Sequence, residues 1–89
     1  MNIYLEQSSS LLDELTQAAQ RADVEAVRGI SHALKSSSAN VGATGLSALC
    51  KKVEHACEHG VIENSLVDQV HKMYFDVELA LNDFLQKVK

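Results

Sequence analysis

The sequence contains no proline and no tryptophan, and only two tyrosines and two phenylalanines among its 89 residues. Sheet proteins are richer in aromatic and β-branched residues, so this composition disfavours a β-rich fold. No run of about 18 apolar residues is present to span a membrane, and the N-terminus lacks the basic and then apolar pattern of a signal peptide. These absences predict one small, soluble, helical domain.

Basic residues are fewer than acidic ones, 8 against 12, and the formal net charge is −4. This balance argues against broad nucleic-acid binding, which requires a basic surface. The charge is unevenly spread, because residues 24–52 contain a single acid, Glu25, and four basic residues: Arg28, Lys35, Lys51 and Lys52. An acidic protein is therefore predicted to have one locally positive patch.

Cysteine is also scarce, with only Cys50 and Cys57. Their spacing places both on one face of a helix, yet about 10 Å apart along its axis, whereas a disulfide tolerates about 6 Å. We interpret them as reduced thiols in the core of a cytoplasmic protein.

Four segments carry apolar residues at steps of three and four, which is typical of amphipathic helices. The first helix is expected over residues 3–21, the second follows Asp23 as its N-cap, the third follows Thr44 as a cap and stops at Gly60, and the fourth covers residues 64–88. The predicted apolar stripes are Leu5, Leu12, Leu15, Ala19; Val24, Val27, Ile30, Leu34, Ser37, Val41; Leu46, Leu49, Cys50, Val53, Ala56, Cys57; and Leu66, Val70, Met73, Val77, Leu81, Phe84, Val88.

Each apolar stripe lies opposite a polar face of its helix, and the predicted connections between the helices are only a few residues long. Short connections make neighbouring helices antiparallel, so we expect an all-α, up-down-up-down four-helix bundle formed by residues 1–89 as a single domain. Since one bundle uses all four stripes, the expected state is a monomer.

His32 falls almost opposite the apolar stripe of its helix, at 100° per residue, and is predicted to be exposed. Its helical neighbours include three small residues, Gly29, Ser36 and Ala39, and two cations, Arg28 and Lys35. Glycine inside a helix costs about 1 kcal/mol relative to alanine. The pattern therefore indicates that small residues keep space open around the imidazole, even though Gly29 lowers the stability of the helix.

A neutral imidazole is a nucleophile near neutral pH. If His32 accepted a phosphoryl group, Lys35 and Arg28 could neutralise the added charge, and Ser36 could donate a hydrogen bond to a phosphoryl oxygen. Two other interpretations are a solvated surface histidine, and a helical-bundle docking module without chemistry. The second explains the stripes equally well, but not the small residues around His32.

The segment "HALKSSSANVGATGL" resembles the signature of histidine-containing phosphotransfer (HPt) domains. The matching positions are His32, Leu34, Lys35, Ser37, Gly42 and Leu46. The resemblance implies a four-helix bundle in which His32 accepts a phosphoryl group from a receiver-domain aspartate and passes it to another receiver. It further implies Leu34 and Leu46 as residues that hold the second and third helices in register. Ser36 stands where many members of the family have glycine, and this difference is expected to influence which receivers the domain binds.

The resemblance implies no kinase activity, and no ATP-binding glycine motif is present in the sequence. It implies no cofactor in this domain and places Mg²⁺ on the receiver partner. It also allows the chain to be a module of a hybrid sensor histidine kinase whose parent is anchored in the inner membrane. Gly29, Ser36, Ala39 and Gly42 are expected to keep the approach to His32 open.

Other polar residues give weaker signals. His55 and His59 have the i, i+4 spacing of a metal clamp, but no third ligand is fixed by sequence, so we interpret them as solvated and expect no metal. His71 lies off its stripe and receives no role. Lys51 and Lys52 are expected either to extend the positive rim that docks an acidic receiver face or to be solvated.

Overall fold

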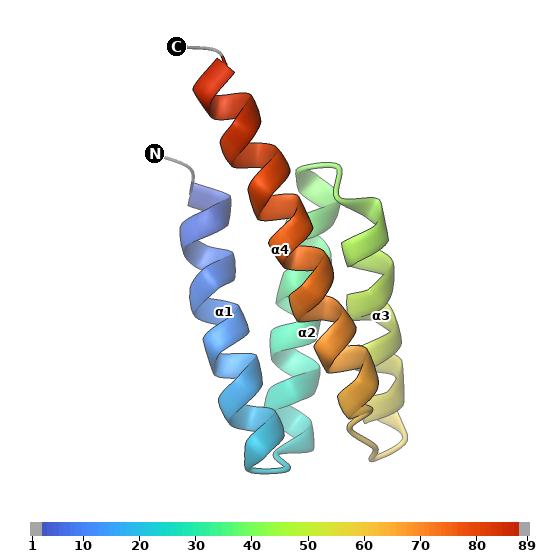
Figure 1. Ribbon diagram of the computed structural model, residues 1–89. Helices are drawn as coiled ribbons and strands as arrows, with labels where there is room; N and C mark the ends of the chain where they lie inside the picture. The colour runs from blue at the N-terminus through green and yellow to red at the C-terminus, as the bar shows by residue number, and fades with distance from the viewer. Residues whose placement is uncertain (1–2, 88–89) are drawn as a thin grey trace.

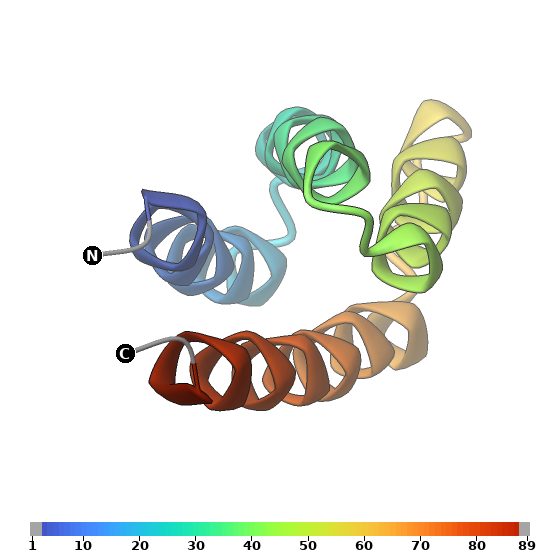
Figure 2. The same ribbon diagram turned by 90° about the horizontal axis from the view of Figure 1, so that it is seen from above.

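Four helices make up the part of the chain that the computed structural model describes, namely the backbone of residues 3–87 and the side chains of Tyr4 and residues 6–84. They are α1 (Ile3–Gln20), α2 (Val24–Asn40), α3 (Thr44–Glu58) and α4 (Asn64–Lys87). Successive helices run in opposite directions (Figure 1), and the view from above shows α4 crossing obliquely from α3 towards α1 (Figure 2). The predicted all-α antiparallel bundle is confirmed.

The helix starts agree with one predicted cap and not with the other. Asp23 is the N-cap of α2, and its Oδ1 accepts a hydrogen bond of 3.1 Å from the Ala26 amide, which satisfies one of the free N–H groups of the first turn. The prediction of Thr44 as a cap is wrong. Helix α3 already includes Thr44, so Ala43 occupies the N-cap position and supplies no side-chain acceptor.

The three helix connections share one backbone arrangement. After α2, Ala43 N–H donates to Ser38 C=O (2.8 Å) and Gly42 N–H donates to Ala39 C=O (3.1 Å), the paired bonds of a Schellman motif. The same pair recurs after α1 and α3. The motif needs a left-handed residue just past the helix, and this residue is Ala22 (φ +55°), Gly42 (φ +81°) or Gly60 (φ +77°). Only Ala22 bears a side chain there and is strained by it.

The core lies along the bundle axis and follows most of the predicted stripes. The buried apolar residues are Tyr4, Leu12, Leu15, Ala18, Val27, Leu34, Leu46, Leu49, Cys50, Val53, Cys57, Val67, Val70 and Tyr74. Tyr4 was absent from the predicted stripe, although its hydroxyl shares a 3.1 Å hydrogen bond with the buried Ser38 hydroxyl. The side chain of Leu5 and the whole of Val88 lie outside the described residues.

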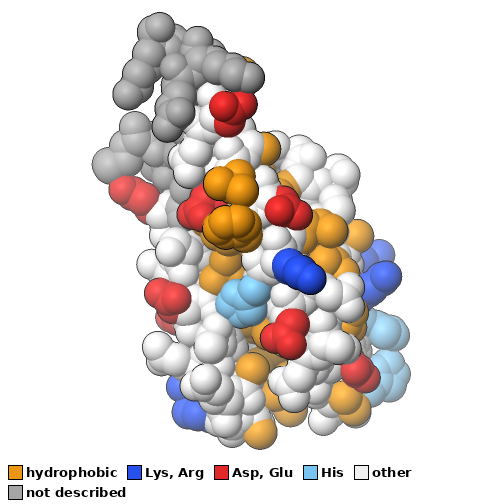
Figure 3. Space-filling model, viewed as in Figure 1, with side chains coloured by type: hydrophobic (Ala, Val, Ile, Leu, Met, Phe, Trp, Pro, Cys, Tyr) orange, Lys and Arg blue, Asp and Glu red, His pale blue; other side chains and the backbone are white. Residues whose placement is uncertain are grey.

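Two predicted core positions are exposed instead. Val41 is 43% exposed because α2 ends at Asn40 and the chain turns away there. Phe84 is 60% exposed, and two other side chains of the same helix are exposed to a similar degree, Phe75 (57%) and Leu79 (53%). Figure 3 shows hydrophobic side chains open to solvent on the α4 face. The stripes are therefore not all used within the bundle, and the monomeric state stays a prediction.

Both cysteines are free and buried. Burial raises the pKa of the Cys50 thiol to about 12 and also raises the pKa of Cys57. Both side chains are therefore protonated at neutral pH, and thiolate chemistry is disfavoured. Over the residues that the structure describes, no helix combines the length and the hydrophobicity needed to cross a membrane.

Candidate functional site

His32 lies on α2 with its side chain 62% exposed to solvent. The prediction that it stands outside the core is confirmed. Leu34, two residues further along α2, is completely buried, as is Leu46 on α3. The α2–α3 pair is fastened additionally by the Ser47 hydroxyl, which donates to the Lys35 carbonyl oxygen across the two helices (3.0 Å). The imidazole therefore stands on a firmly packed pair of helices.

The partner of the imidazole is Glu54, a residue of α3 that is only 9% exposed. One carboxylate oxygen, Oε2, lies 2.8 Å from His32 Nδ1, and the other, Oε1, accepts a 2.6 Å bond from Lys35 Nζ. An ionised carboxylate can only accept hydrogen bonds. Nδ1 therefore carries the proton and donates it to Glu54, which leaves a lone pair on Nε2.

The ionised state of Glu54 follows from its neighbours. The hydrogen bond from Lys35 lowers the pKa of this carboxyl most, burial opposes that shift, and the hydrogen bond from His32 lowers the pKa further. The net direction is downward, so Glu54 is charged at neutral pH. The tautomer of His32 is thus fixed by a carboxylate on another helix that is negatively charged at neutral pH.

Small or open positions surround part of the ring. A Cβ built on Gly29 meets no atom within 4 Å, and Ser36 and Ala39 are exposed. Gly42 is different, because it lies ten residues beyond His32, about 15 Å along the helix axis. The expectation that Gly42 clears the approach to His32 is not supported by this position. Its positive φ serves the turn between α2 and α3 instead.

The predicted positive patch contains a negative centre. Lys35 is paired with Glu54, and Arg28 is paired with Glu25 at 3.2 Å. The Lys35 ammonium has three N–H donors and gives one to Glu54. Two donors therefore stay available to another acceptor near the imidazole.

Lys51 and Lys52 are exposed on α3 and line a groove of about 470 Å³. Ala56 and Leu66 form its apolar lining, and His55 lies beside the lysines. The groove combines apolar lining with a basic edge. The groove lies between α3 and α4, and the docking of an acidic receiver face by Lys51 and Lys52 stays a prediction.

Ser37, one of the stripe positions of α2, is partly buried. Its hydroxyl donates to the Ala33 carbonyl oxygen at 3.0 Å. Back-bonding of this kind explains how a serine is accommodated within a helix.

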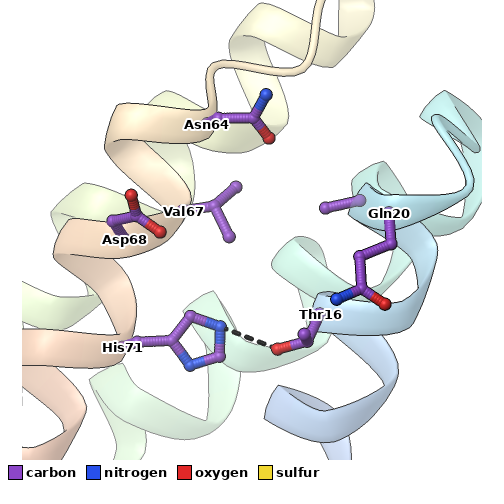
Figure 4. Close-up of a pocket in the computed structure, with 7 residues that line it drawn as sticks. Thr16, Gln20, Asn64, Val67, Asp68 and His71 are labelled. Carbon is purple, nitrogen blue, oxygen red and sulfur yellow. Dashed lines mark hydrogen bonds between the residues drawn. The ribbon is translucent and has the colours of Figure 1, made fainter.

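A second histidine, His71, links the other two helices, α1 and α4. His71 of α4 lies 3.0 Å through Nε2 from Thr16 Oγ1 of α1, at the side of a groove of about 550 Å³ (Figure 4). The Thr16 hydroxyl donates its proton to the Leu12 carbonyl oxygen (3.1 Å). It must accept from His71, so Nε2 carries the ring proton there. Helical spacing assigned no role to His71, because its partner is 55 residues away.

Glu54 was likewise missed by reasoning from sequence. Helical spacing reveals neighbours at i±3 and i±4 only, whereas Glu54 is 22 residues from His32. A signal was nevertheless present. Glu54 follows the apolar positions Cys50 and Val53 and precedes Cys57, so the sequence places a charge at the border of a buried stripe. Such a charge requires a partner.

Comparisons with known proteins agree with this geometry. The sequence profile of the Hpt domain matches residues 1–88. A solved structure, that of histidine-containing phosphotransfer protein B (HptB) from Pseudomonas aeruginosa PAO1, superposes with a TM-score of 0.91 at 27% sequence identity. The match covers 94% of this chain and 75% of that one. A search of curated proteins finds no match. The chain belongs to the Hpt domain family and serves histidine phosphotransfer in phosphorelays.

Proposed function

We propose that Nε2 of His32 is the atom that accepts and returns the phosphoryl group. The observation that carries this proposal is the 2.8 Å contact between His32 Nδ1 and the buried Glu54 carboxylate, which leaves the Nε2 lone pair free on an exposed ring. A nucleophile positioned by a second group that fixes its tautomer is a recurring arrangement in covalent catalysis.

The transfer step balances without a proton leaving the ring. The Nε2 lone pair attacks phosphorus, the bond from phosphorus to the aspartyl oxygen breaks, and the receiver recovers its carboxylate. The product is an Nε2-phosphoryl imidazolium whose Nδ1–H still donates to Glu54. The Glu54 carboxylate offsets the positive charge that the ring gains, and attack by a second receiver carboxylate on phosphorus returns His32 to its neutral form.

Residues beside the ring can donate hydrogen bonds to the negatively charged oxygens of the phosphoryl group and offset their charge. Lys35 offers the ammonium donors that Glu54 does not use, and Ser36 offers a hydroxyl. Arg28 lies one turn before His32 and adds a further cation. We assign Mg²⁺ to the receiver and no cofactor to this domain, because phosphoryl transfer needs charge neutralisation on the aspartate side as well.

Receiver domains are the partners that this function requires. We assign their docking to the face around His32, including Gly29 and Ala39, with Lys51 and Lys52 meeting acidic side chains. The net charge of −4 argues against a nucleic-acid partner. We further propose a monomer acting in the cytoplasm, where the buried thiols of Cys50 and Cys57 stay reduced. A hybrid kinase as the parent chain is compatible with the same role.

The test is transfer from a phosphorylated receiver domain to the wild type and to His32→Gln. Wild type is expected to gain an acid-labile, alkali-stable label, and His32→Gln none. Circular dichroism of the variant should match that of wild type, because the side chain is mostly exposed. Label on a folded His32→Gln variant contradicts the assignment of the residue. Absence of label on wild type across a panel of receivers favours a docking module without chemistry.

A further inference from the structure

The outer face of α3 carries a pair of histidines that the phosphoryl site does not use. His55 and His59 are both exposed, and their ring centroids lie 4.9 Å apart with the planes at 69°. Figure 3 shows histidine side chains lying together at the α3 edge of the molecule. Two imidazoles that share one ion at metal–nitrogen distances of about 2.0–2.1 Å have ring centres roughly 5 Å apart. The rings are thus already at the separation that chelation requires.

The two rings also have their Nδ1 atoms facing oxygen. His59 Nδ1 lies 3.1 Å from the His55 carbonyl oxygen, and a carbonyl can only accept, so this Nδ1 carries the proton. His55 Nδ1 lies 3.7 Å from Glu58 Oε2, which is too long for a hydrogen bond, but the nearby carboxylate charge favours a proton on that nitrogen. Both Nε2 atoms are then lone-pair donors. Oxygen partners on the far ring nitrogen are the usual second shell of metal-binding histidines.

Charge around the histidine pair is mixed, because Lys51 and Lys52 lie one turn before His55, whereas the end of α3 is negative. The helix ends at Glu58, and the carbonyl groups of its last turn point towards this end and carry the negative end of the helix dipole. The Glu58 carboxylate adds a further negative charge beside His55. Among the described residues, no group of three or more His, Cys, Asp or Glu gathers to hold a metal. An ion bound here would have two protein ligands and would complete its shell with water.

In place of the expectation from sequence that these histidines are solvated and hold no metal, we infer that His55 and His59 form a chelating site for a divalent transition metal ion that prefers imidazole ligands, such as Zn²⁺ or Ni²⁺. Such an ion takes no part in phosphoryl transfer and is not a cofactor of that reaction. The site is separate from the phosphoryl acceptor and does not depend on the proposed function. Mg²⁺ prefers oxygen ligands and should not bind there. Because the ion joins two successive turns at the end of α3, it should bind the folded chain better than the unfolded one and raise the melting temperature.

The test is isothermal titration with Zn²⁺ alone, in a non-coordinating buffer, on the full chain without a histidine tag. Wild type is expected to bind one ion, with a rise in melting temperature of a few degrees, whereas Mg²⁺ has no effect. His55→Ala and His59→Asn should each weaken Zn²⁺ binding at least tenfold. Asparagine is tolerated at a helix end, and circular dichroism checks that both variants are folded. His32→Gln, which removes a histidine on another face, should bind Zn²⁺ as wild type does.

Three results overturn the inference. One is a wild-type chain that binds no Zn²⁺ at a concentration of about 1 mM, the weakest dissociation constant on the usual affinity scale. The second is unchanged binding in folded His55→Ala and His59→Asn. The third is loss of binding in His32→Gln, which places the ion at the Glu54 carboxylate instead.

Discussion

His32 and His71 each bridge two helices through one ring nitrogen, yet the two rings have opposite tautomers. His32 donates from Nδ1 to the Glu54 carboxylate and leaves Nε2 free, whereas His71 donates from Nε2 to the Thr16 hydroxyl. The His32 ring is mostly exposed, while His71 is partly buried in the side of the α1–α4 groove (Figure 4).

The difference explains how one residue type serves two purposes in a small bundle. A carboxylate partner both fixes the tautomer and offsets a positive charge on the ring, so it prepares the ring for a reaction that creates such a charge. A hydroxyl partner fixes the tautomer but does not offset a positive charge on the ring. The α2–α3 contact is therefore suited to chemistry, and the α1–α4 contact to holding helices together.

Among the changes considered, replacement of Glu54 should have the largest effect, because it removes the carboxylate that distinguishes the surroundings of His32 from those of His71. Glu54→Ala removes both the acceptor and the charge, and we expect the rate of phosphoryl transfer to fall roughly 10- to 100-fold. Glu54→Gln keeps an acceptor oxygen for Nδ1–H but loses the charge, so its rate should lie between those of Glu54→Ala and wild type. Single-turnover transfer from a phosphorylated receiver measures both. A wild-type rate in Glu54→Ala removes the carboxylate from the mechanism.

Acid should weaken the α2–α3 contact and leave the α1–α4 contact alone. The pKa of Glu54 is lower in the folded chain than the ordinary value of about 4.3. Its contribution to stability is therefore complete above that ordinary value and is lost as pH falls through the lowered folded pKa. Urea unfolding should show wild type more stable than Glu54→Gln at pH 7, by about 1 kcal/mol, with the gap closing as the pH falls below 4. A gap that persists unchanged at low pH contradicts the ionic origin.

Thr16→Val should affect stability without affecting transfer. The substitution leaves the His71 Nε2–H without its partner in a partly buried place, at an expected cost of about 1 kcal/mol of unfolding free energy. Thr16→Ser keeps the hydroxyl and is the matched control. Urea unfolding and the transfer assay together check the assignment, and a fall in transfer rate for a folded Thr16→Val variant shows that His71 is not merely structural.

Ala22→Gly gives the smallest change and touches neither histidine. It relieves the positive φ at the turn between α1 and α2 and should stabilise the chain by up to about 1 kcal/mol. Transfer should be unchanged. Gly42→Ala at the equivalent position after α2 should have the opposite effect on stability. Thermal unfolding of both variants checks the pair, and equal melting temperatures show that left-handed strain is not what distinguishes these turns.

Periodicity was sufficient for the helices, because each apolar stripe is a local property of the chain. It gave the four segments, the Asp23 cap and the exposure of His32. It failed where a helix ends or extends beyond the bundle. Val41 and Phe84 keep the right spacing but have no neighbouring helix surface to cover them.

The site was only partly predictable for a related reason. His32 and its small neighbours lie within one helix and are visible in the sequence. The contacts of Glu54 with His32 and Lys35 depend on the register between α2 and α3, which residue spacing within one helix does not contain. For the same reason, the sequence predicted only that Lys35 neutralises a phosphoryl group. In the structure its ammonium already donates a hydrogen bond to Glu54.

The placement of Glu54 on a different helix from His32 has a thermodynamic consequence. A positive charge created on the ring strengthens an attraction that runs between α2 and α3, so phosphorylation and the closed packing of these helices favour each other. By linkage, whatever loosens the junction must also shift the phosphoryl group towards the receiver. Slower amide exchange along α3 in the phosphorylated chain is the signature of this coupling, so the local stability of the bundle itself reports whether the histidine is loaded.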